Sequence, residues 1–287
     1  MIYVRQEINE FTYSNIISTV PDYDENSNYM LGDLVRVGNY EYKSLFGTVE
    51  LPNKGNNPLT TQGVNWFLYG SSNQYACLDS YPETKTVWEG NGVCEFLRGQ
   101  KDTLGIGAFD ATKITIEYRD LLDNILESEE ILFSNSVGVY DEWTYGYAEF
   151  TSNTINTLYL PLKLISKKIR VIFQNDGKST SCGFLTAGRA VYVGDTIEGV
   201  NFPDKRTGNR TVPTADFSTI IDNNLLMIKI NEAKKLINET MLFVIDESEN
   251  SQHGNMVFLG TITKVDGAAD NFEKNKISWQ IEQTILQ

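Results

Sequence analysis

The chain has 287 residues, of which 41% are hydrophobic and 11% aromatic, and it carries a formal net charge of −14 at pH 7. This length suits two or three domains, because compact domains commonly run about 100–150 residues, and the composition is that of a globular protein. The negative charge disfavours nucleic acid and anionic membrane surfaces as partners, since no cluster of Lys and Arg offsets it locally.

Export and membrane insertion are not expected for this chain. No apolar run approaches the ~20 residues needed to span a bilayer, and residues 1–7 lack the charged-then-apolar order of a signal peptide. Three widely spaced cysteines, Cys77, Cys94 and Cys182, lie in apolar strand-like contexts, which favours buried free thiols over disulfides or metal ligands. This pattern suits folding in a reducing cytoplasm.

Residues 1–28 are expected to form an irregular N-terminal arm rich in Asn, Asp and Ser, with a helical or turn segment over residues 11–17 and a break at Pro21. Residues 22–26 imitate the start of a calcium loop, but the sixth position is not Gly and the twelfth is not Glu. These polar side chains therefore predict turn capping, and no metal site is expected.

Residues 29–72 predict a small β-module. A Gly-Asp turn opens a strand, alternating Leu, Val and Tyr residues pattern two short strands, and Trp66 closes the unit. The aromatic side chains have two possible roles. One set is a core for a module too small to build one from aliphatic residues: Tyr29, Tyr42 and Trp66. The other set presents flat ring faces to a sugar: Tyr40, Trp66 and Tyr69.

Residues 73–190 predict a jelly-roll-like antiparallel β-sandwich, because alternating apolar runs recur between Gly, Asn, Asp and Ser turns. Three aromatic residues in this region, Trp143, Tyr145 and Tyr147, are spaced by two, so a strand would carry all of them on one face. We interpret that face as sandwich core, the alternative being an aromatic ladder on the surface.

The last third of the chain is expected to hold a connecting loop and a small α+β domain. Residues 191–224 are rich in Gly, Asn, Thr and Pro and too polar for a core, which is typical of a loop that reaches outward. Residues 225–287 then predict one helix covering a small sheet, with a strand at 225–230, the helix at 231–237 and strands at 241–245, 256–262 and 276–282.

No catalytic residue, metal site or cofactor is expected, and we predict that the chain is not an enzyme. The only histidine, His253, excludes any constellation of several histidines, and neither a Gly-x-Ser-x-Gly elbow nor a phosphate-binding loop is present. Glycoside hydrolysis needs two carboxylates about 5–9.5 Å apart across a cleft. Adjacent acids such as Glu129 and Glu130 arise by chance in a chain with 38 acidic residues.

Two resemblances suggest a function. The order of residues 29–35, 40–42 and 66 resembles small chitin-binding-type modules of glycan-active proteins. Together with residues 18–21, 73–79, 143–147 and 183–189, it resembles a family of bacteriophage and prophage tail proteins with a carbohydrate-binding domain. Where the glycan-binding relatives carry paired exposed tryptophans after Tyr42, this chain has Lys-Ser-Leu-Phe.

The resemblance implies a structural component of the virion, in its tail, neck or baseplate, assembled in the host cytoplasm. Its implied partners are other tail, neck or baseplate proteins and copies of itself in a ring. The N-terminal arm and the loop near residue 201 are the expected assembly contacts, at Pro21, Asp22, Asn201, Phe202, Arg206 and Arg210. The alternative function is adsorption, with the β-module binding a polysaccharide of the host surface.

Overall fold

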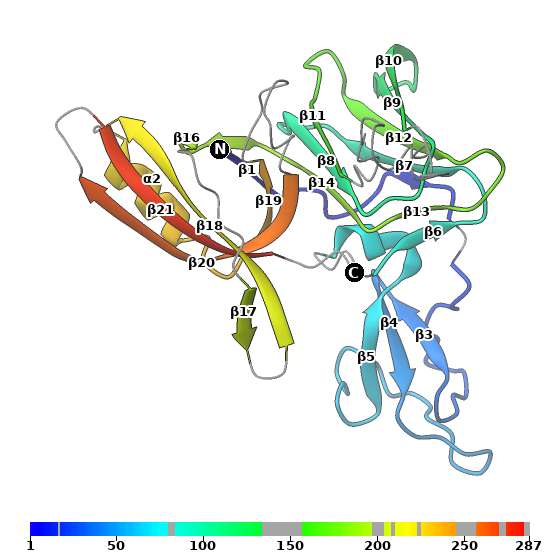
Figure 1. Ribbon diagram of the computed structural model, residues 1–287. Coiled ribbons are helices and arrows are strands. Elements are labelled where there is room, and N and C mark those ends of the chain that lie inside the picture. The colour runs from blue at the N-terminus through cyan, green and yellow to red at the C-terminus, as the bar shows by residue number, and fades with distance from the viewer. Residues whose placement is uncertain are drawn as a thin grey trace, which may run out of the picture.

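The computed structural model describes residues 1–16, 18–79, 84–133, 157–196, 204–207, 210–222, 225–244, 257–269 and 274–283. Antiparallel sheets dominate these residues, which confirms the prediction of a mainly β chain (Figure 1). Among them, no helix combines the length and the apolar character that crossing a bilayer requires.

The small β-module is a three-stranded antiparallel sheet in the order β3 (Leu34–Val37), β4 (Tyr40–Ser44) and β5 (Trp66–Ser71). Its core consists of Tyr29, Val35, Tyr42 and Trp66, which are all buried. The Tyr29 and Trp66 rings meet edge to face with centroids 5.3 Å apart, a favourable geometry for aromatic pairs. The predicted aromatic core of the module is therefore confirmed.

Two further sheets face each other across the largest core. The five-stranded sheet has the order β10 (Ile125–Leu132), β9 (Lys113–Arg119), β12 (Lys168–Gln174), β7 (Gly92–Leu97) and β2 (Tyr13–Ser14). The three-stranded sheet has the order β11 (Thr157–Pro161), β8 (Thr103–Gly107) and β14 (Phe184–Gly188). A short pair, β6 (Thr86–Trp88) and β13 (Thr180–Cys182), and the 3₁₀ helix η1 (Asn73–Leu78) lie beside them.

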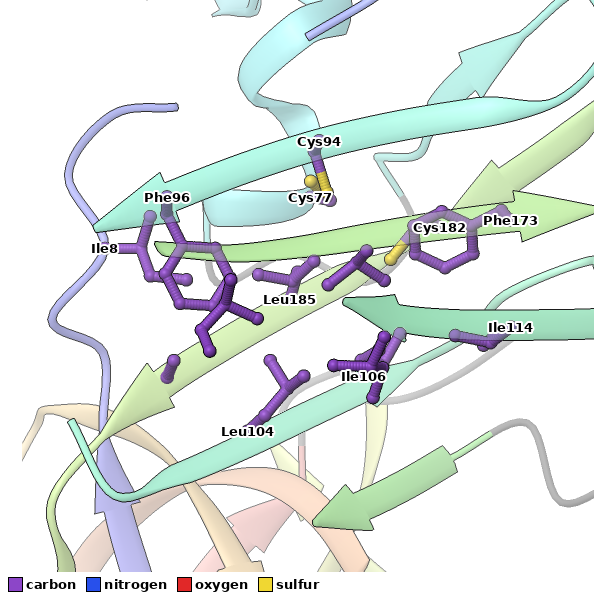
Figure 2. Packing of buried hydrophobic residues seen from close by; sticks show 14 of the residues in the cluster. Ile8, Cys77, Cys94, Phe96, Leu104, Ile106, Ile114, Phe173, Cys182 and Leu185 are labelled. Carbon is purple, nitrogen blue, oxygen red and sulfur yellow. The ribbon is translucent and has the colours of Figure 1, made fainter. Parts of the chain in front are cut away.

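The period of two predicted for these strands sets the facing core. Along β12, Ile169, Val171 and Phe173 are fully buried, while the residues between them are partly exposed. Figure 2 shows side chains of both sheets meeting in one cluster. The aromatic face predicted as core at residues 143–147 lies outside the described residues.

The three cysteines are free and buried, as the sequence predicts. All of them belong to the core between the sheets, and Figure 2 shows Cys77 and Cys94 side by side. Removal from water disfavours a thiolate, so burial raises the pKa of Cys94 and of Cys182. Both thiols are therefore packing groups and not nucleophiles.

The remaining strands form an eight-stranded sheet. Its order is β15 (Ala190–Tyr192), β1 (Ile2–Arg5), β19 (Thr240–Val244), β20 (Val257–Ala269), β21 (Lys274–Gln283), β18 (Arg210–Asp222) and β16 (Asp195–Thr196), and β17 (Asp204–Thr207) pairs with β18. One helix, α2 (Leu226–Lys234), packs on β20 and β21. His253 lies outside the described residues.

The start of the chain is not an irregular arm. Residues Ile2–Arg5 pair with β15 on one side and with β19 on the other, and the Met1 ammonium donates a hydrogen bond to the Gly194 carbonyl at 2.6 Å. The strand buries both of its faces, because Tyr3 packs among residues of the eight-stranded sheet and Val4 packs against Phe184 of β14. Residues 13 and 14, expected in a helix or turn, form strand β2.

The predicted boundary at residue 225 also differs from the structure. Within the expected loop 191–224, Arg210–Asp222 is a long strand paired with β21 through nine residues. Residues 226–230, expected as a strand, lie in α2, where Leu226, Ile230 and Ala233 recur at helical spacing and face the sheet. Gly267 permits this contact, because a Cβ there would lie 2.1 Å from the Ile230 Cδ1 atom.

Candidate functional site

One exposed aromatic surface lies on the outer face of the β-module. Alternation along β4 and β5 turns Tyr42 and Trp66 toward the core, while Lys43 and Phe67, which are cross-strand partners, point away from it. A β-bulge opposite Glu41 and Tyr42 adds one residue to β5, and this residue is Tyr69. The Lys43 Nζ atom lies 6.0 Å from the centroid of the Tyr69 ring, at the limit of a cation–π contact.

The structure separates the three residues expected to bind a glycan. Tyr40 and Tyr69 are 49% and 59% exposed, but Trp66 is fully buried and its indole N–H donates to the Asn56 carbonyl at 2.6 Å. Trp66 is therefore a core residue and not part of a sugar platform. Alternation along β4 places Tyr40 on the side of Tyr42, opposite Lys43, so Tyr40 and Tyr69 do not share a face.

The sequence analysis missed two members of this surface, Lys43 and Phe67. Phe67 is 55% exposed and lies between buried Trp66 and partly buried Leu68, so its outward direction follows from alternation alone. The bulge that presents Tyr69 beside Lys43 has no signature in the local sequence. We call Lys43, Phe67 and Tyr69 the module face.

The expected assembly residues are placed differently. The Arg36 side chain forms an ion pair of 2.8 Å with Asp22, and the Arg36 amide donates to the Pro21 carbonyl at 2.8 Å. The guanidinium lowers the pKa of the Asp22 carboxyl, so both residues fasten the incoming segment to β3. Arg206 lies in β17 and Arg210 begins β18, whereas Asn201 and Phe202 lie outside the described residues.

The acids Glu129 and Glu130 do not face each other across a cleft. Glu129 forms an ion pair with Lys163, and Glu130 forms one of 3.1 Å with Lys113. Neighbouring carboxylates raise the pKa of Lys163. In the described part of the chain, no group of three or more His, Cys, Asp or Glu side chains is placed to hold a metal ion.

Comparisons with protein-family models, with curated proteins and with solved structures found no match for this chain. Its surfaces are therefore the physical basis for a functional proposal.

A second exposed surface, which the sequence analysis missed, lies at one end of the five-stranded sheet. It combines the turn between β9 and β10 with the loop between β11 and β12, and both carry large aliphatic side chains. Their exposed fractions are 64% for Leu121, 83% for Leu122, 80% for Leu164 and 59% for Ile165. We call these four residues the aliphatic end.

Hydrogen bonds fix both loops of the aliphatic end and hold them together. The Asp120 carboxylate accepts from the Leu122 and Asn124 amides at 2.8 and 2.9 Å. The Lys168 side chain bonds Asp123 at 2.6 Å, and the Lys167 amide donates to the Arg119 carbonyl at 2.8 Å. Polar residues thus form the turn and leave its two leucines in water. The sequence did contain a signal for this surface, because two leucines inside an Asp-x-x-Asp-Asn turn are expected to be exposed.

Proposed function

We propose that this chain is a structural component of a bacteriophage virion and acts by multimeric protein–protein assembly in a tail, neck or baseplate. The resemblance of residues 18–21, 29–35, 73–79, 143–147 and 183–189 to phage tail proteins supports the virion assignment. The aliphatic end carries the assembly proposal. Four large aliphatic side chains on fixed loops form an apolar surface, and covering it with a protein partner is favourable because it removes this surface from water.

The chemistry of the aliphatic end favours a protein over a glycan. Sugars are recognised by flat aromatic rings and by hydrogen bonds to their hydroxyls, and branched aliphatic side chains supply neither. Burying a Leu side chain completely contributes about 1.5–3 kcal/mol, so four partly exposed side chains offer a substantial driving force. Because the net charge of −14 makes copies repel one another, short-range apolar contact has to overcome this repulsion.

The assembly proposal is tested by introducing charge at the aliphatic end. The variant Leu122→Glu/Leu164→Glu replaces two leucines that make few contacts within the chain with acidic residues. We expect it to fold normally, to stay monomeric and to enter particles poorly, as measured by light scattering and by its abundance in purified virions. The matched control is Val49→Glu, at a side chain of the β-module that is 81% exposed. Unchanged incorporation of the double variant, with the control also normal, contradicts the proposal.

A second candidate function is adsorption to a surface polysaccharide through the module face. The observation that favours it is the exposure of two outward rings, Phe67 and Tyr69, beside the Lys43 ammonium. In a whole-cell binding assay, Tyr69→Ala is expected to abolish saturable binding. Tyr40→Ala removes a similarly exposed ring from the other side of β4 and serves as the matched control. Equal binding by both variants rules out the module face.

The resemblance also supports a proposal about domain types. We propose that residues 29–72 are a chitin-binding-type module, since a sheet of three short antiparallel strands packs on an aromatic core. For residues 73–190 we propose a jelly-roll-like sandwich, since two antiparallel sheets share one core. The helix α2 and the strands after it form the proposed α+β unit, which the structure joins to β1 and β18 in one sheet.

A further inference from the structure

The end of the five-stranded sheet opposite the aliphatic end carries a pocket of about 640 Å³. It lies where β10 ends, β9 begins, β12 ends and the turn before β7 approaches, because Leu132 and Gln174 are both cross-strand partners of Lys113. A volume of 300–1,000 Å³ is typical of small-ligand sites. We call it the turn pocket. Its lining includes Asn91, Lys113, Phe133, Gln174 and Asp176.

We infer that the turn pocket is a second binding site, for a neutral carbohydrate. This inference does not depend on the assembly proposal. Three polar side chains of the lining, those of Asn91, Gln174 and Asp176, make no hydrogen bond or ion pair with any described residue. An amide offers both a donor and an acceptor, and a carboxylate accepts from two donors, which is the set that neighbouring sugar hydroxyls require.

The two turns that carry Asn91 and Asp176 are held in place before any ligand binds. The Lys178 amide donates to the Asn175 carbonyl at 2.7 Å, and the buried Asn175 amide group donates to Asp110 at 3.1 Å and to the Ser179 carbonyl at 3.2 Å. The turn before β7 is held by the Asn15 amide group, which donates to the Asn91 carbonyl at 2.8 Å. A turn whose backbone is already fixed costs little ordering entropy when a ligand binds.

Backbone hydrogen bonds also fix the floor of the turn pocket. The Phe133 amide donates to the Thr112 carbonyl, and the Thr112 amide donates to the Gln174 carbonyl, each at 2.8 Å. The Phe133 ring packs edge to face on Phe109 with centroids 4.8 Å apart, and Leu132 beside it is 76% exposed. An aromatic ring such as that of Phe133 can cover the C–H face of a sugar ring while the amides bind its hydroxyls.

The charges of the turn pocket favour a neutral ligand over an ion. The Lys113 ammonium is paired with Glu130 at 3.1 Å, so Asp176 leaves the lining negative and repels phosphates and other anions. One carboxylate is too few for a divalent cation, which takes six or more oxygen ligands. A purely apolar ligand would leave three polar side chains without partners.

The test is saturation-transfer NMR on the whole chain with glucose, galactose, N-acetylglucosamine, maltose and chitobiose. We expect at least one of these sugars to receive saturation, and Asp176→Asn to weaken its binding about ten-fold, since a tenfold change corresponds to one lost hydrogen bond to a charged group. Asn tolerates the left-handed conformation of residue 176, whose φ is 43°, so the turn is preserved. Gln174→Ala also keeps the sheet, because residue 174 contributes its carbonyl to the hydrogen bonds.

Two controls assign any bound sugar to a site. Glu50→Gln neutralises an exposed acid of the β-module and is expected to change nothing, whereas Tyr69→Ala reports on the module face. Binding that is lost in Tyr69→Ala but retained in Asp176→Asn and Gln174→Ala overturns the inference and favours the adsorption function. Absence of saturation transfer from all five sugars also overturns it, and neither result changes the assembly proposal.

Discussion

The two ends of the five-stranded sheet are built from the same strands and differ in almost every property of their surfaces. β9 and β12 each have seven residues and so separate the two ends by about 20 Å. The aliphatic end projects leucines from polar turns, whereas the turn pocket is hollow and lined by amides and a carboxylate. Strand alternation sets the core that the ends share, whereas the turns and the strand ends set the chemistry that each end presents.

Two asparagines make this comparison testable. Asn175, beside the turn pocket, is 7% exposed and uses its amide group to hold the turn, whereas Asn124, at the aliphatic end, is exposed and bonds the Asp120 carboxylate at 2.8 Å. Asn175→Ala removes both hydrogen bonds of a buried amide group, those to Asp110 and to the Ser179 carbonyl, so the free energy of unfolding is expected to fall by about 1–3 kcal/mol.

Asn124→Ala is the matched control. Its free energy of unfolding is expected to fall by no more than about 0.5 kcal/mol, because the Asp120 carboxylate can bond water in place of the lost amide group. Urea unfolding of both variants measures the difference. Equal losses for the two asparagines would show that the turns at the two ends are equally rigid, against the preorganisation argued for the turn pocket.

A second comparison uses pH and two buried tyrosines. Burial raises the pKa of Tyr118, near the aliphatic end, to about 12, and it does the same for Tyr3 in the eight-stranded sheet. Between pH 10 and pH 12 the folded chain holds protons that the unfolded chain releases. The contribution of these two phenols to the free energy of unfolding is therefore complete below pH 10. It is lost as the pH rises toward 12, by about 1 kcal/mol per pH unit or less for each phenol.

Tyr118→Phe is expected to reduce the alkaline slope of the free energy of unfolding, and Tyr3→Phe to reduce it by a similar share from a different sheet. Denaturant unfolding at several pH values between 9 and 12 measures both slopes. A slope that is unchanged in Tyr118→Phe would mean that this phenol titrates normally and is hydrated in the folded chain.

The sequence predicted strands correctly where neighbouring residues alternate between apolar and polar. Alternation in Lys113–Arg119 and Lys168–Gln174 correctly indicated strands and their inner faces, and the aromatic core around Trp66 was also correct. Residues 2–5 were missed because their partners in β15 and β19 are far along the chain, and no local pattern encodes such pairing.

The candidate sites show the same limit. Exposed Tyr40 and Tyr69 were anticipated, but only the β-bulge places Tyr69 beside Lys43, and only the pairing of four strand ends brings Gln174 close to Phe133 and Asn91. The predicted start of the helix, at residue 231, lies after the observed start of α2 at Leu226, because the apolar residues at its beginning also suit a strand.

The smallest effect on stability is expected at the aliphatic end itself. Leu122→Ser/Leu164→Ser shortens two side chains that are at least 80% exposed, so the free energy of unfolding of the monomer should change by no more than about 0.5 kcal/mol. Self-association should nevertheless decrease, because the polar replacements remove apolar area from the contact surface. Thermal unfolding and sedimentation velocity measure the two quantities separately. A large loss of stability would mean that these leucines support the fold, and the aliphatic end would then differ from the turn pocket in packing as well as in surface chemistry.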